Sequence, residues 1–250
     1  MLLQHLVATR RPRLLLTGFK PWGDHPLSSF NPSQAVLPNL ATRARHQGYQ
    51  VKVAIMSVDT GVIRSMLEDA YHDFVPDFAL HLGLHGFNNK LNIEAAAYNG
   101  VSGIFDDRLI PKNAPEALDS SLALGEERRP SLDVVDLVTR LNAAGRWQKF
   151  VTAETSRMLN DRFGCNMCHF LALGLAEEVG AVALFIHLPQ DSALRYRFPK
   201  PWKDRRENEN RIQDMGKSIG MPLIDMTIQL QRLTKWWIKQ RWPQRQATRP

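Results

Sequence analysis

The chain has 250 residues, of which 44% are hydrophobic and 23% charged, as is ordinary for a globular protein long enough to bury one large core. Its two cysteines exclude a disulfide scaffold, and no apolar run approaches the roughly 18–20 residues that a transmembrane helix needs. The net charge of +7 invites a nucleic-acid partner, but no helix-turn-helix, zinc-finger or RNA-recognition pattern accompanies it. The N-terminal MLLQHLVATRRPR lacks the features of a signal peptide, so we expect a cytoplasmic protein. From the apolar runs and the missing motifs, we also expect no membrane span and no nucleic-acid partner.

The first third of the chain alternates between strand and helix patterns. Short apolar runs predict strands at residues 13–19, 51–58 and 77–85, the last leading into a loop around Gly86. Helical spacing predicts a helix over residues 32–48, which Pro38 should interrupt, and a second over residues 60–74.

The alternation continues after a stretch rich in Gly, Asp and Pro between residues 98 and 130, where we expect loops. Helices are predicted at residues 131–145 and 166–180, and strands at residues 149–156 and 181–189. Nearly continuous apolar strands that alternate with helices predict a single α/β domain, an open, mostly parallel twisted sheet with helices on both faces.

The C-terminal stretch RLTKWWIKQRWPQRQATRP interleaves basic residues with tryptophans. We therefore expect an α/β domain over residues 1–229 and a basic, Trp-rich extension over residues 230–250. Such a segment can contact phosphates or an anionic surface. The alternative, which we favour, is a final helix that packs its tryptophans on the core and ends in a solvated tail.

Both cysteines lie in GCNMCHFLALGL, residues 164–175. Cys165 follows Gly164 at the expected start of a helix, where free amide groups and the helix dipole favour a thiolate. His187 lies near the end of the last predicted strand, where a base can reach that sulfur. A nucleophile with a base is the minimum for cysteine hydrolase chemistry.

Three other interpretations of the cysteine pair compete with the nucleophile. Structural zinc needs four ligands, and His169, the nearest candidate besides His187, directly follows Cys168 and should point away around the helix. A thioredoxin-like dithiol fits poorly so late in the chain. Cysteines that are merely buried are common, so spacing alone leaves this interpretation and the nucleophile balanced.

Five short motifs, taken together and in this order, resemble the pyroglutamyl peptidase I (pyrrolidone carboxyl peptidase) family over about residues 13–215. They are Thr17-Gly18-Phe19 with Pro21-Trp22-Gly23 and Asn31-Pro32-Ser33; His81 with Gly83-Leu84 and then Glu94; FDDRLIPKN at residues 105–113; Phe163-Gly164-Cys165-Asn166; and Phe185-Ile186-His187 with Pro189.

The resemblance implies a cysteine peptidase that removes an N-terminal pyroglutamate from small peptides, without a cofactor or metal. Cys165 would be the nucleophile, His187 the base and Glu94 the group that orients the imidazole, although Glu94 taken alone would be expected to be a solvated loop carboxylate. Relatives in the family are often homo-oligomers.

The resemblance also implies a binding site for the substrate. The apolar box for the lactam ring would be made by Phe19, Trp22 and Phe163, with Asn31 bracing the first loop. Helical spacing, independently of the resemblance, puts Cys168 on one apolar stripe with Leu171 and Leu175, so we expect it to be buried, with a raised thiol pKa.

The chain departs from the family pattern beside two of these motifs. Leu159, Asn160 and Asp161 stand before the nucleophile, and His85 to Asn88 follow the third strand, in place of small residues and of a Gly-Gly-Arg stretch. These departures keep an alternative open: a catalytically diverged or inactive binding or scaffold protein on the same fold.

Overall fold

The computed structural model describes residues 10–21, 30–84, 90–101, 104–105, 111–112, 116–143, 150–153, 164–189 and 221–248. The strands are β1 (Arg13–Phe19), β2 (Gln50–Met56), β3 (Phe78–Leu84), β4 (Leu91–Glu94), β5 (Ala97–Tyr98), β6 (Ile104–Phe105), β7 (Pro111–Lys112), β8 (Glu127–Arg128), β9 (Phe150–Ala153) and β10 (Val182–Leu188). The helices are α1 (Pro32–Ala35), α2 (Leu37–His46), α3 (Thr60–Phe74), α4 (Val134–Ala143), α5 (Gly164–Glu178) and α7 (Leu223–Thr248).

The main sheet has six strands in the order β2-β1-β3-β10-β4-β9. Strands β2, β1, β3 and β10 are mutually parallel, whereas β4 runs antiparallel to β10. The prediction of a mostly parallel α/β sheet is therefore confirmed. Strand β4, with the sequence LNIE, was not predicted, because four residues are too short for a period to stand out from the preceding loop.

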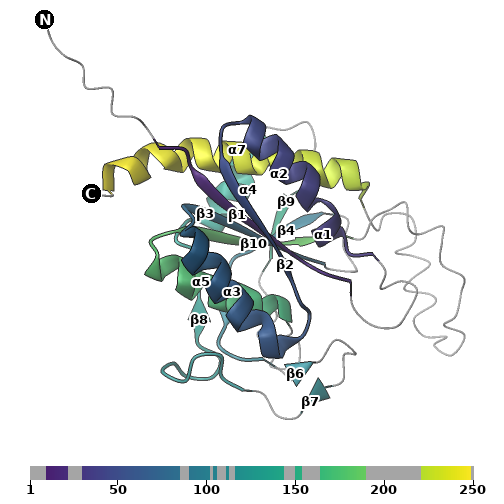
Figure 1. The fold of residues 1–250 in the computed structure, drawn as a ribbon, viewed down its shortest axis with the longest axis vertical. Helices are drawn as coiled ribbons and strands as arrows, with labels where there is room; N and C mark the ends of the chain where they lie inside the picture. The colour runs from purple at the N-terminus through teal and green to yellow at the C-terminus, as the bar shows by residue number, and fades with distance from the viewer. Residues whose placement is uncertain are drawn as a thin grey trace, which may run out of the picture.

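Alternate residues of the central strands enter two different hydrophobic cores, as the pleat requires. Leu14 and Leu16 pack in the core that is shared with α2, α4 and α7. Leu15 and Phe19 pack in the core shared with α3 and α5. Helices therefore cover both faces of the sheet, as Figure 1 shows. The side chains of His81 and His187 lie on the face of the sheet that α5 covers.

The predicted interruption near Pro38 is found where α1 and α2 meet. The two helices are separated at Val36, and Pro38 lies in the first turn of α2, where its missing N–H costs no intrahelical hydrogen bond. The first loop packs tightly here, since a Cβ built on Gly18 would lie 2.2 Å from the carbonyl oxygen of Ser33. Glycine is therefore needed at this end of β1.

The C-terminal stretch lies, as far as Thr248, in one helix, α7, which crosses the outside of the sheet beside α2 (Figure 1). The boundary expected between residues 229 and 230 falls inside this helix. Beyond it, Leu230, Leu233, Trp237 and Ile238 are buried in the same core as β1 and β3. The described residues contain no helix of the length and apolarity that a bilayer crossing requires.

Candidate active site

A histidine and a carboxylate from neighbouring antiparallel strands form the centre of the site. His187 lies near the end of β10 and is paired in register with Asn92 of β4, two residues before Glu94. His187 Nδ1 lies 2.6 Å from Glu94 Oε1, and both side chains are buried. The alternative of a solvated loop carboxylate is wrong for Glu94, because the register of β4 turns this side chain into the interior.

Cys165, at the start of α5, adds a sulfur to this histidine–carboxylate pair. Cys165 is the second residue of that helix and is only partly buried, and its side chain is hydrogen-bonded to His187. Gly83 of β3 leaves room for the sulfur, since a Cβ there would lie 2.9 Å from Cys165 Sγ. Glu94, His187 and Cys165 thus lie in one chain of contacts, although they come from three separate elements.

The electrostatics of the group depend on His187. Burial acts to lower the pKa of this imidazole, whereas the charge of Cys165 and hydrogen bonds to Cys165 and Glu94 act to raise it. The balance raises the pKa of His187 from 6.5 to about 10. At neutral pH the ring is therefore an imidazolium between a sulfur and a carboxylate.

The expected residues of the lactam box are only partly within the described structure. Phe19 is the last residue of β1 and is buried, and its ring lies 4.0 Å from the position of a Cβ on Gly164, next to Cys165. Trp22 and Phe163 lie outside the described residues.

Asn31 is buried and caps α1. Its Oδ1 accepts hydrogen bonds from the backbone N–H and the hydroxyl of Ser33, at 3.0 and 2.8 Å. Its Nδ2 donates to the carbonyl of Lys20 at 3.4 Å. These bonds link Lys20, directly after β1, to the start of α1.

Asn166, next to the sulfur, has a part in the site that sequence reasoning did not assign. Its Oδ1 accepts from the N–H of Tyr98, and its Nδ2 donates to the carbonyls of Tyr98 and Gly100, each at 2.9 Å. These bonds fasten the chain that follows Glu94 to the first turn of α5. The motif included Asn166, but its partners, Tyr98 of β5 and Gly100 after it, are not visible in the sequence.

Cys168 has the surroundings of a core residue, as predicted. It is fully buried in the core that also holds Leu171 and Leu175. Burial, reinforced by the charge of Cys165, raises the pKa of its thiol well above the usual value.

Two further histidines lie in the interior near the site. His81 is satisfied by Thr17 at Nδ1 (2.8 Å) and by Tyr71 at Nε2 (2.9 Å). His169 packs against Phe185, with ring centroids 5.5 Å apart, and within the described part of the chain neither of its ring nitrogens has a hydrogen-bond partner. Burial lowers the pKa of each imidazole to about 3, so both rings are neutral. Among the described residues, no three His, Cys, Asp or Glu side chains are grouped so as to hold a metal ion.

The fold and the site together define an α/β protein in which a partly buried cysteine lies beside a buried histidine and a buried carboxylate. No protein-family model matches the chain. The pyrrolidone-carboxylate peptidase of Oceanobacillus iheyensis is 29% identical to it over 184 residues, which are 73% of this chain and 86% of that protein. The protein of the same name from Pyrococcus furiosus is 27% identical over 121 residues, which are 45% of this chain and 56% of the relative.

The fold agrees with these sequence relatives. The crystal structure of pyrrolidone carboxyl peptidase from Thermus thermophilus superposes with a TM-score of 0.66 at 24% identity, covering 88% of this chain and 97% of that one. The chain is thus similar to pyrrolidone-carboxylate peptidases in sequence and in fold, and the resemblance that the motifs indicated is confirmed.

Proposed function

We propose that the protein is a cysteine peptidase that hydrolyses the amide bond after an N-terminal pyroglutamyl residue. The relatives found by sequence are named pyrrolidone-carboxylate peptidases, and a hydrolase needs a nucleophile, a base and a group that orients the base. The observation that carries the proposal is that the imidazole of His187 has two partners, a carboxylate and a thiol. His187 is bonded to Glu94 through Nδ1, which leaves Nε2 for the hydrogen bond with Cys165.

In the first half of the reaction, the Cys165 sulfur adds to the pyroglutamyl carbonyl carbon. The carbonyl oxygen takes up the negative charge, which the N–H groups of the first turn of α5 are suited to stabilise, because they have no acceptor within the helix. The imidazolium of His187 then gives its proton to the leaving amine as the C–N bond breaks. A thioester to Cys165 and a free peptide amine result.

In the second half, His187 is neutral and acts as a base. It takes a proton from water as the water oxygen adds to the thioester carbon, and the C–S bond breaks to release pyroglutamate and the Cys165 sulfur. Glu94 keeps the imidazole in one orientation through both halves and stabilises its charged form. We assign Glu94 no proton transfer of its own.

Recognition of the substrate follows from its flat lactam ring. Phe19 is suited to cover one face of this ring, because it reaches the first residue of α5 beside the sulfur. Trp22 and Phe163 are proposed to complete the box, and Asn31 to hold the loop that carries it. Hydrogen bonds to the lactam N–H and C=O would reject analogues that lack these groups more strongly than apolar contact can.

The direct test measures hydrolysis of a fluorogenic pyroglutamyl amide by the purified protein. The matched control is the prolyl amide of the same fluorophore, whose ring has the same size but lacks the lactam carbonyl. We expect release from the pyroglutamyl amide alone, and its loss after treatment with a thiol alkylator. Equal hydrolysis of both amides would refute the lactam specificity.

The alternative is a diverged protein that binds without turnover. Calorimetry that measures the binding of a pyroglutamyl peptide to the unaltered protein and to Cys165→Ala separates the two possibilities. Binding by the unaltered protein with no product after prolonged incubation would favour a binding protein. If the protein neither binds nor hydrolyses the peptide, pyroglutamyl peptides are excluded as its ligands.

A further inference from the structure

Helices α2 and α7 carry a basic surface that the catalytic reaction does not use. Exposed basic side chains project from both helices: Arg43, Arg45 and His46 from α2, and Arg232, Lys235 and Lys239 from α7. The sequence has no Asp or Glu between Asp24 and Asp59, and none after Asp225. Neither α2 nor the part of α7 beyond Asp225 therefore contains an acidic residue.

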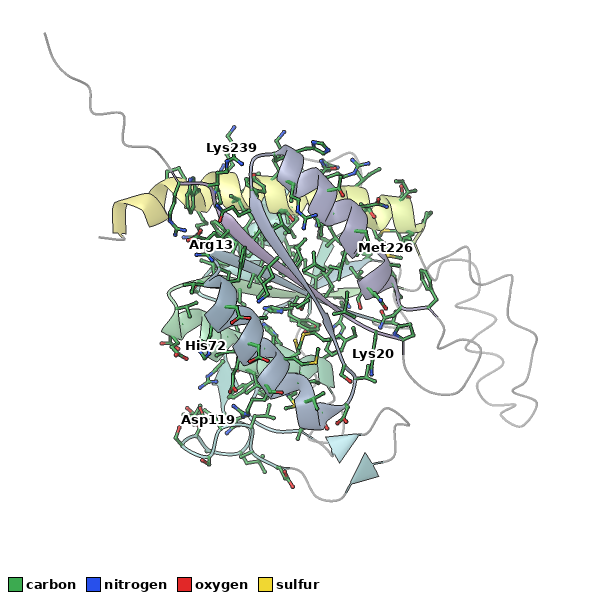
Figure 2. The ribbon with its side chains drawn as sticks, viewed as in Figure 1. Arg13, Lys20, His72, Asp119, Met226 and Lys239 are labelled. Atoms are coloured by element: carbon green, nitrogen blue, oxygen red, sulfur yellow. The ribbon has the colours of Figure 1, made fainter. Side chains whose placement is uncertain are left out.

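The two helices form one surface. Arg43 Nη1 donates to Gln231 Oε1 at 2.7 Å, which ties α2 to α7 on the outside of the sheet. The helices lie side by side in Figure 1, and Figure 2 shows Lys239 projecting from α7 away from the sheet. Residues 223–242 of α7 alone extend for about 30 Å at 1.5 Å per residue.

This surface lies on the side of the sheet opposite the candidate active site. α2 and α7 cover the core that contains Leu14 and Leu16, whereas α5, with Cys165, covers the core that contains Leu15 and Phe19. A partner on α2 and α7 would thus leave the start of α5 open to substrate.

Apolar side chains share the exposed stripe of α7 with the basic ones. Ile224 and Ile228 are 55% and 37% exposed. At 100° per residue, they lie within about a quarter turn of Lys235 and Lys239. Charge alone suits any polyanion, but an exposed isoleucine gains nothing from a phosphate backbone, whereas it can bury itself at the headgroup–acyl boundary of a bilayer.

We propose that the α2–α7 surface binds the protein reversibly to membranes that carry anionic lipids. Its basic residues are attracted by the negative surface potential, which is worth roughly 1 kcal/mol for each Lys or Arg near the surface. Ile224 and Ile228 insert among the headgroups. The attraction falls as salt shortens the Debye length, which is about 8 Å at physiological ionic strength.

The test is sedimentation of the full chain with vesicles of phosphatidylcholine containing 30% phosphatidylserine, and with vesicles of phosphatidylcholine alone. We expect binding only to the anionic vesicles, and release in high salt. Lys235→Gln with Lys239→Gln should weaken partitioning at least about tenfold, given the free energy that each basic residue contributes. The matched control, Arg64→Gln with Arg129→Gln, removes the same charge from α3 and from the residue after β8, and should leave binding nearly unchanged.

The isoleucines distinguish a bilayer from nucleic acid. Ile224→Ser with Ile228→Ser keeps the charge and should weaken vesicle binding, and a circular dichroism melt would confirm that the variant is folded. Absence of binding to anionic vesicles, or equal loss in both pairs of charge variants, would overturn the proposal. So would tighter binding to a 20-bp DNA duplex that the isoleucine substitutions do not affect.

Discussion

At the scale of single residues, the chemistry depends on which cysteine of α5 can meet a substrate. Cys165 is partly exposed and hydrogen-bonded to His187, whereas Cys168 is fully buried. The two cysteines are three residues apart, but only Cys165 lies at the N-terminal end of the helix. A Cys-x-x-Cys spacing here joins a candidate nucleophile to a core residue.

Replacement of Cys165 by Ser should leave less than about a hundredth of the turnover, because an unactivated hydroxyl is a much poorer nucleophile than a thiolate. The initial rate with the fluorogenic pyroglutamyl amide measures the effect. A circular dichroism melt serves as the control for folding. Substantial activity in Cys165→Ser would exclude the proposed mechanism.

Replacement of Cys168 by Ala should retain turnover. The variant removes a small buried side chain, so its free energy of unfolding should fall by only about 1 kcal/mol. Urea denaturation and the same amide assay measure the two quantities. If Cys168→Ala were as inactive as Cys165→Ala, the assignment of Cys168 to the core alone would fail.

The raised pKa of His187 predicts an alkaline limit to activity. Because its folded pKa lies near 10, above the ordinary 6.5, the imidazolium that protonates the leaving amine is present below that pH and is lost as the pH rises through it. Glu94→Gln removes one of the raising causes, so the alkaline limb of kcat/KM should move to lower pH. Glu68→Gln, a partly exposed carboxylate of α3 that is paired with Arg64, is the control. An unchanged limb in Glu94→Gln would contradict the coupling.

At the scale of elements, the site depends on how segments far apart in the chain are fastened together. Glu94 and His187 are 93 residues apart and meet because β4 pairs antiparallel with β10. The chain after β4 is then held to α5 by the side chain of Asn166. One amide thus joins the segment of the carboxylate to the helix of the sulfur.

Replacement of Asn166 by Ala should reduce stability and activity together. It would leave three buried backbone groups, two of Tyr98 and one of Gly100, without their partner, and each such group costs roughly 1–3 kcal/mol. We expect a loss of about 3 kcal/mol in urea denaturation. The exposed Asn39→Ala is the control, and a loss as small as that of the control would refute the role of Asn166.

At the scale of the whole molecule, α7 is part of the hydrophobic core. Trp237 is 1% exposed and packs edge-on against Phe78 of the central strand β3, with ring centroids 5.2 Å apart. The helix presents apolar residues to the sheet and basic ones to the outside. Of the two expectations for this segment, the structure agrees with a final helix whose tryptophan packs on the core.

Replacement of Trp237 by Ala should therefore destabilise the entire chain by about 3–5 kcal/mol. For a domain of this size, the melting temperature should fall by roughly 10 °C. Gln240→Ala, exposed on the same helix, should change stability by less than about 0.5 kcal/mol. A similar small effect of Trp237→Ala would mean that α7 is only loosely attached.

The sequence by itself determined the features that depend on neighbours along the chain. The apolar runs at residues 13–19 and 181–189 predicted β1 and β10, because burial on both faces requires continuous apolar residues. Gly164 and Cys165 were predicted at a helix start, and Pro38 at an interruption. The spacing of Cys168, Leu171 and Leu175 predicted one buried stripe.

Only the tertiary structure decided the features that depend on distances through space. That Glu94 lies on a strand, and 2.6 Å from His187, is set by strand pairing between distant segments. The need for glycine at position 83 comes from a sulfur on another element, and the partners of Asn166 are Tyr98 of β5 and Gly100 after it. The continuity of α7 with the core comes from packing against β3. Local propensity and periodicity do not encode these contacts, because register and packing fix them only when the whole sheet has formed.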